Sequence, residues 1–200
     1  MSTSRLVILG RDGTINVFRG DHVKSPDEWT PIDGVLEAIA RMHHAGWHLV
    51  VASNQSGIGR GMYDMASLNA VHAKMMSMVA AAGGRIDAVF FCPHAPNEPC
   101  DCRKPLPGLL LEIGERYGAR MNDVIAVGDS LKDLQAAAAA GCEPHLVRTG
   151  RAAALGDDEL AQWLAQVPGT RVHADLAAFA EMLVQRADAI GAYAAPARRA

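Results

Sequence analysis

The sequence predicts an α/β fold, in which a Rossmann-like parallel sheet carries helices on both faces. Strand-like apolar runs alternate with helix-like stretches along the chain, and a polar cluster follows most of these runs. Repeated alternation of this kind joins parallel strands through right-handed crossovers. The 200 residues, half of them hydrophobic but only 5% aromatic, can bury one core made mainly of aliphatic side chains.

The first half of the chain contains two predicted strands and two predicted helices. The apolar run at 6–9 is the first strand, and the charged stretch at 17–31 after it is irregular. Asp33 is the expected N-cap of a helix whose apolar residues recur at helical spacing and which ends near Gly46. A second strand follows at 47–52. A Met-rich helix at 65–82 then ends at two glycines.

The second half continues the alternation. Strands are predicted at 86–91, 124–127 and 144–147, with helices at 109–117 and 134–140 between them. No internal repeat and no domain boundary interrupts this pattern. We therefore expect one domain over residues 1–190 and a flexible tail over 191–200.

Composition and charge argue against several classes of protein. The formal net charge of −3 indicates neither a nucleic-acid-binding surface nor a membrane-surface patch. No secretory signal pattern opens the chain, and no apolar run is long enough to span a membrane. We therefore expect a cytoplasmic protein. In that compartment, three cysteines within one short segment indicate a metal site rather than a disulfide framework.

Polar residues with complementary chemistry follow the predicted strands. Asp12 comes after the first strand, Ser53 after the second, Lys104 after the Cys-rich loop and Asp129 after the fourth. The carboxyl ends of parallel strands share one edge of an open sheet, so these side chains are expected to line one site. Hydroxyl and ammonium groups suit a phosphoryl group, and carboxylates suit Mg²⁺.

Each of these features has a plainer explanation when taken alone. Ser53 could belong to a capped turn, and Arg103 with Lys104 could be a solvated surface pair. Asp129 could cap the next helix, and Asp133 could be a supporting group or an ordinary helix residue.

A short loop carries four candidate zinc ligands. Its pattern is Cys-x-His-x5-Cys-x-Cys, formed by Cys92, His94, Cys100 and Cys102. Three thiolates and one imidazole complete a closed tetrahedral shell, which is the structural form of a zinc site. Reduced, unligated thiols on a surface loop are the alternative. Cys142 stands alone after a helix and is expected to be a small core residue.

The strand-end residues occur in the order of the haloacid dehalogenase phosphatase motifs. The first motif of that family is Asp-x-Asp-Gly-Thr, which the run Gly10-Arg11-Asp12-Gly13-Thr14 resembles except at its first position. The later motifs are matched by Ser53, Lys104 and Gly128-Asp129 with Asp133. The resemblance extends from about residue 6 to residue 150. It implies a capless fold, catalytic Mg²⁺ and an aspartyl-phosphate intermediate.

The Cys-rich loop narrows the resemblance to one branch of the family. With the Arg103-Lys104-Pro105 run, it looks like the branch of heptose 1,7-bisphosphate 7-phosphatases and histidinol-phosphate phosphatases. The run at 53–61 is more similar to the heptose enzymes, and the histidinol-phosphate enzymes are the alternative. The resemblance implies structural Zn²⁺, a monomer, and a role in making activated heptose for lipopolysaccharide.

The resemblance also assigns roles to individual residues. The residue at position 10 would attack phosphorus, and Asp12 would protonate the leaving oxygen and then activate water. Ser53 and Lys104 would stabilise the phosphoryl group, while Asp129 and the backbone carbonyl of Asp12 would hold Mg²⁺. The residues expected to contact the substrate are Arg11, Phe18, Arg19, Gly20, Asp21, Asn54, Gln55, Ser56, Arg103 and Ser130. Ser130 stands where heptose enzymes often carry Lys, and helical geometry is expected to turn Lys132 to a different side.

Gly10 stands where the family has its nucleophilic Asp. Glycine supplies neither an attacking oxygen nor a metal ligand. We expect turnover at least ~10³-fold slower than with Asp at this position, by analogy with other nucleophile deletions. Mg²⁺ should bind more weakly, and phosphate binding should survive.

Several explanations of Gly10 are open. It could have arisen in cloning, through deliberate inactivation, or in a natural sugar-phosphate binder without catalysis. The retained Asp12 favours an acquired change in an active lineage. A zinc-loop protein-interaction module is a further alternative, but it leaves Ser53, Lys104 and Asp129 unexplained.

Overall fold

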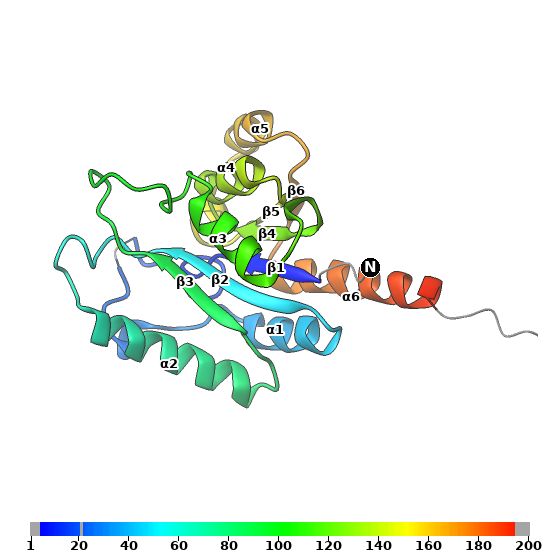
Figure 1. Ribbon diagram of the computed structural model, residues 1–200, viewed down its shortest axis with the longest axis horizontal. Coiled ribbons are helices and arrows are strands. Elements are labelled where there is room, and N and C mark those ends of the chain that lie inside the picture. Colours follow the sequence, from blue (N-terminus) through cyan, green and yellow to red (C-terminus); the bar gives the residue numbers. More distant parts are fainter. Residues whose placement is uncertain (1–4, 21, 195–200) are drawn as a thin grey trace, which may run out of the picture.

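In the computed structural model of the chain, six parallel strands form one sheet in the order β3-β2-β1-β4-β5-β6 (Figure 1). The structure describes the backbone of residues 5–20 and 22–194 and the side chains as far as residue 189. The strands are β1 (Leu6–Leu9), β2 (His48–Asn54), β3 (Ala88–Cys92), β4 (Ile125–Gly128), β5 (Glu143–Val147) and β6 (Arg171–His173). Strand order reverses between β1 and β4, which is where open α/β sheets bind ligands.

Helices cover both faces of the sheet (Figure 1). One face packs against α1 (Val35–His44), α2 (Met65–Ala81) and α6 (Leu176–Ala194). The other packs against α3 (Gly108–Tyr117) and α4 (Leu131–Ala140), and α5 (Asp157–Gln166) lies beyond α4. Three short 3₁₀ helices complete the described elements: η1 (Pro26–Glu28), η2 (Met121–Asp123) and η3 (Gly150–Ala154).

The alternation of side chains in β1 explains why both faces need a cover. Val7 and Leu9 are buried in the core beneath α1, α2 and α6, whereas Leu6 and Ile8 are buried in the core beneath α3 and α4. A strand buried on both faces reads as a continuous apolar run. This is the pattern from which the first strand was predicted, and the predicted and observed bounds agree.

The structure corrects the predicted start of two helices. The N-cap of α1 is Gly34 and not Asp33, because the chain enters the helix through a left-handed residue (φ 75°), which favours glycine. Helix α4 begins at Leu131 and not at 134. The Asp133 carboxylate accepts hydrogen bonds from the N–H and Oγ of Ser130, and this stabilises an earlier first turn.

Three elements near the C-terminus lie outside the predicted pattern. β6 has only three residues and α5 contains no buried residue, so neither shows a strong apolar signal. α6 does carry buried residues at helical spacing: Leu176, Phe179, Ala180, Leu183 and Ala187. This helix runs through the first four residues of the expected tail, and residues 195–200 lie outside the described part. Within the described residues, no helix combines the length and apolarity needed to cross a membrane.

Candidate active site

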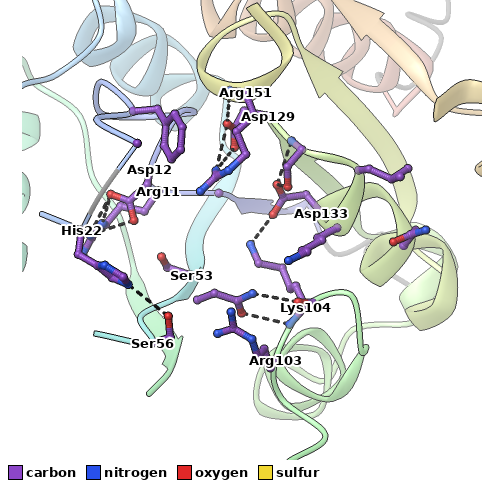
Figure 2. Close-up of a pocket in the computed structure, with 18 of the residues that line it drawn as sticks. Arg11, Asp12, His22, Ser53, Ser56, Arg103, Lys104, Asp129, Asp133 and Arg151 are labelled. Atoms are coloured by element: carbon purple, nitrogen blue, oxygen red, sulfur yellow. Dashed lines mark hydrogen bonds and ion pairs between the residues drawn. The ribbon is translucent and has the colours of Figure 1, made fainter. Parts of the chain in front are cut away.

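A cavity of about 530 Å³ opens at the carboxyl edge of the sheet. Residues from the segments after β1, β2, β4 and β5 line it, as do residues from the loop that leads into α3. Figure 2 shows Asp12, Ser53, Lys104 and Asp129 around this cavity. The four strand-end residues singled out from the sequence therefore share one site.

Gly10 follows β1 and lines the cavity. Its N–H donates to the Val127 carbonyl (2.9 Å), and its φ is not positive, so this backbone suits any L-residue. A Cβ added at Gly10 would lie 2.7 Å from Thr14 Oγ1, with all other contacts at 3.4 Å or more. Thr14 Oγ1 is buried and has no hydrogen-bond partner among the described residues. A buried hydroxyl without a partner costs free energy. A hydrogen-bond acceptor beside Gly10 would remove this cost.

The Asp12 carboxylate is held by three neighbouring side chains. Arg11 Nη2 donates to both carboxylate oxygens (2.9 and 3.0 Å), Gln55 Nε2 donates to Oδ2 (2.9 Å), and Asn16 Nδ2 donates to Oδ1 (3.1 Å). Behind Arg11, His72 Nε2 lies 3.1 Å from Nη1 and is the acceptor, because a guanidinium has only donors.

These contacts set the charge of Asp12. Burial alone would raise the pKa of Asp12, but the charge of Arg11 and the hydrogen bonds from Arg11, Asn16 and Gln55 outweigh burial and lower it. Burial and the nearby Arg11 charge lower the pKa of His72 to about 4, so the imidazole is neutral at physiological pH. In this arrangement Asp12 is a carboxylate that can accept a proton.

Lys104 is held from two directions at the side of the cavity. Its Nζ donates to the Ala52 carbonyl (2.8 Å) and to Asp133 Oδ1 (2.5 Å). The Asn54 side chain bonds both the N–H and the carbonyl of Lys104, and this ties the end of β2 to the loop before α3. Burial opposes the ionisation of Asp133, but the Lys104 charge and hydrogen bond lower its pKa. Asp133 therefore orients the ammonium group.

Asp129 is a buried carboxylate at the end of β4. A Cβ on either Gly13 or Gly150 would collide with its Oδ2, so both backbones approach it closely. Burial and the neighbouring Asp133 charge raise the pKa of Asp129 to about 6, against the opposing effect of Arg151. A buried carboxylate whose charge Arg151 offsets only in part fits a hard cation such as Mg²⁺. The set is incomplete, because Gly10 supplies no second carboxylate.

Arg151 is a pocket residue that the sequence analysis missed. Its backbone N–H donates to Asp129 Oδ2 (2.8 Å), and its side-chain Nη1 lies 3.3 Å from the same oxygen. Its guanidinium also lies over the Phe18 ring, 3.9 Å from the centroid. The rule that polar residues follow strand ends, applied to the fifth strand, would have found it.

The residues expected to contact the substrate do not all line the cavity. Phe18, Gly20, Asn54, Ser56, Arg103 and Ser130 line the cavity, and His22 contacts Ser56. Arg11 also borders it, but its side chain is fully buried against Asp12. Gln55 lies behind Asp12, Arg19 is exposed outside the cavity, and Asp21 lies outside the described residues. Lys132 lines the cavity, so the expectation that α4 turns it elsewhere is wrong.

The candidate zinc ligands converge on one point. The donor atoms of Cys92, His94, Cys100 and Cys102 all lie within 4.8 Å of one another. Cys92 Sγ is 3.9 Å from Cys100 Sγ and 3.5 Å from His94 Nδ1, and Cys102 Sγ is 3.3 Å from His94 Nδ1. Edges of this length fit a tetrahedron with bonds of about 2.0–2.3 Å to zinc. Cys142 is buried in the core beneath α3 and α4, as predicted.

Comparison with known proteins points to one family. The model for haloacid dehalogenase-like hydrolases matches residues 7–141. The chain is 53% identical to the D-glycero-β-D-manno-heptose-1,7-bisphosphate 7-phosphatase of Bordetella bronchiseptica, over 92% of this chain and 99% of the relative. The Pseudomonas aeruginosa protein of the same name is 49% identical, over 90% and 98% of the two chains.

Solved structures agree with these relatives. The crystal structure of the B. bronchiseptica D,D-heptose 1,7-bisphosphate phosphatase, complexed with magnesium and phosphate, matches with a TM-score of 0.83 and 52% identity. The match covers 91% of this chain and 99% of that one. The Burkholderia thailandensis enzyme of the same name matches with a TM-score of 0.66 and 48% identity, over 90% and 98%.

Proposed function

Because the chain belongs to the haloacid dehalogenase-like hydrolases, we propose that its site is built to remove the 7-phosphate of D-glycero-D-manno-heptose 1,7-bisphosphate. We also propose that Gly10 leaves this phosphatase without its nucleophile. The observation that carries the proposal is the single cavity in which Asp12, Ser53, Lys104 and Asp129 meet, in a chain 53% identical to a named heptose phosphatase.

The residues of the cavity divide the work of phosphoryl transfer. Lys104, oriented by Asp133, and the buried Ser53 hydroxyl would bind the phosphoryl oxygens. Asp12 would exchange a proton with the leaving oxygen and with water, and its carboxylate would have to turn away from Arg11 to do so. Asp129 and the Asp12 backbone carbonyl would hold Mg²⁺, which neutralises charge on the phosphoryl group when bound.

The Cys-rich loop is proposed to hold one structural Zn²⁺. Four donors close a complete shell and leave no position open for a substrate or water. The loop continues directly into Arg103 and Lys104, so the ion would fix the segment that presents both cations to the cavity.

The proposal is tested by restoring the carboxylate at position 10. Gly10→Asp should release phosphate from heptose 1,7-bisphosphate in the presence of Mg²⁺, and much more slowly from histidinol phosphate. Gly10→Asn is the matched control, because the asparagine side chain has the shape of aspartate but no ionised carboxylate. Faster hydrolysis of histidinol phosphate by Gly10→Asp would instead assign the site to that substrate.

A second candidate function rests on Gly10 itself. The groups that bind a phosphoryl group are assembled without a nucleophile, so the chain could bind a sugar phosphate and not hydrolyse it. Calorimetry with heptose 1,7-bisphosphate distinguishes the candidates. Tight binding by this chain, together with an inactive Gly10→Asp variant, would favour the binding protein.

A further inference from the structure

We propose that the cavity wall at Gly10 binds a small monocarboxylate such as formate, and that this anion can replace the missing nucleophile. The inference rests on the proposed phosphatase function. It goes beyond that function by giving this chain a ligand site and a dependence on an added anion.

The first support is the geometry at the end of β1. The three atoms nearest to an added Cβ at Gly10 are Thr14 Oγ1 at 2.7 Å, Thr14 Cβ at 3.4 Å and the Gly128 Cα at 3.5 Å. The 2.7 Å contact is too short for a real Cβ, so the Thr14 hydroxyl must first rotate about its Cα–Cβ bond, and Thr14 is the only side chain among these atoms. Gly10 itself lines the 530 Å³ cavity, so a small anion can reach this position from solvent.

The second support is the unpaired hydroxyl of Thr14. This side chain is 0% exposed, and its Oγ1 has no partner among the residues that the structure describes. A hydroxyl can donate one hydrogen bond, and a carboxylate oxygen can accept it. Formate would thus satisfy a group that the protein leaves unsatisfied.

The third support is the charge balance of the cavity. Asp12 is paired with Arg11, Asp133 with Lys104 and Asp129 with Arg151. Arg103 and Lys132 line the cavity outside these three pairs, and the Mg²⁺ proposed at Asp129 would add to the positive charge that meets an added carboxylate. Formate should bind more tightly with Mg²⁺ than without it.

The chemical step balances without any other reagent. A formate oxygen forms a bond to phosphorus while the bond from phosphorus to the sugar oxygen breaks. The sugar oxygen leaves with that electron pair and takes a proton transferred through Asp12, which regains a proton from the water that later cleaves the acyl phosphate. The product on the anion is formyl phosphate, an acyl phosphate like the aspartyl-phosphate of the family. Water then cleaves it to formate and inorganic phosphate.

Phosphate release from heptose 1,7-bisphosphate by this chain, with Mg²⁺ and rising sodium formate, tests the proposal. Sodium chloride at equal ionic strength is the control. We expect saturable acceleration of about tenfold, well below full activity, because an untethered nucleophile lacks the high effective concentration of a tethered one. Gly10→Ala, which fills the position of the Cβ, should lose most of the acceleration. Gly10→Asp should show none.

A measurement independent of turnover uses [¹³C]formate as the probe. Its NMR line should broaden with this chain and Mg²⁺, and the broadening should fall at least several-fold in Thr14→Val. If formate accelerates no more than chloride while Gly10→Asp is active, the anion site is wrong and the phosphatase proposal stands. Equal acceleration of Gly10→Asp would mean a general salt effect and would overturn the site. If Gly10→Asp is also inactive, both proposals fail.

Discussion

At the scale of single residues, the site is organised as pairs of opposite charge. Asp12 is paired with Arg11, Asp133 with Lys104, and Asp129 with Arg151. None of these pairs includes position 10. This independence explains how a chain with Gly10 can keep the rest of a phosphatase site assembled. Thr14 Oγ1, beside Gly10, is one of the buried side-chain atoms that lack a hydrogen-bond partner within the described part of the chain; Asn16 Oδ1 and Trp29 Nε1 are others.

Asp133→Asn tests the buried pair with Lys104. Their side chains are only 13% and 9% exposed, so removing one charge leaves the ammonium poorly compensated. We expect the free energy of unfolding to fall by about 2 kcal/mol, as measured by urea denaturation. Asp123→Asn removes the exposed pair with Arg120 and should cost less than about 1 kcal/mol. Equal losses in the two variants would contradict this account of Lys104.

At the scale of elements, the loops that follow the strand ends build the site. The Cys-rich loop positions the segment that carries Arg103 and Lys104. Cys92 ends β3, and the segment from Cys92 to Cys102 leads directly to Arg103 and Lys104. This segment contains no helix or strand after β3. A bound ion would replace the backbone pairing that the segment lacks.

Metal analysis of the purified chain tests this arrangement. We expect one zinc per chain, loss of zinc in Cys100→Ser, and a fall in melting temperature of several degrees or more. Weaker binding of inorganic phosphate should accompany the loss, because Lys104 follows the loop. Cys142→Ala should keep its zinc, since Cys142 lies in the core. A full zinc content in Cys100→Ser would contradict the four-ligand site.

The elements also show what the sequence could predict. Strands buried on both faces, such as Leu6–Leu9, are visible as apolar runs, and the residues after them were placed at one edge by topology. Short or exposed elements, such as α5 and β6, carry no such signal. Lys132 was misplaced because the first turn of α4 borders the cavity, which depends on where the helix starts. The partners of Arg11 come from distant elements, so spacing alone did not reveal them.

At the scale of the whole molecule, α6 packs at the edge of the sheet against a histidine pair, of which His145 is buried and His173 is half-buried. His145 on β5 and His173 on β6 stack with their ring nitrogens 2.9 Å apart, and Phe179 of α6 packs edge-on against both. Burial lowers the pKa of His145 to about 4, although Glu143 acts in the opposite direction. The folded protein therefore holds a neutral imidazole at this junction.

This pair predicts a pH dependence of stability. The pKa of His145 is lower in the folded chain than the ordinary 6.5, so the unfolded chain binds more protons between pH 6.5 and 4. Stability should be fully present above about pH 6.5 and should fall as the pH drops to 4, by up to about 3 kcal/mol from this group. His72, whose pKa is also lowered to about 4, adds to the loss in the same range.

Urea denaturation between pH 7 and 4.5 measures this dependence. His145→Gln should have a shallower slope of unfolding free energy against pH than the unchanged chain. His44→Gln, which replaces an exposed histidine of α1, should keep the original slope. If His145→Gln kept the full slope, His145 would not be the source of the acid sensitivity.

The central claim is that one absent carboxylate separates this chain from an active phosphatase. The most direct test compares kcat/KM for phosphate release from heptose 1,7-bisphosphate between this chain and Gly10→Asp, at saturating Mg²⁺. We predict that Gly10→Asp is at least ~10³-fold faster. Comparable rates in the two proteins would contradict the claim, because the carboxylate at position 10 would then not be the nucleophile that the site lacks.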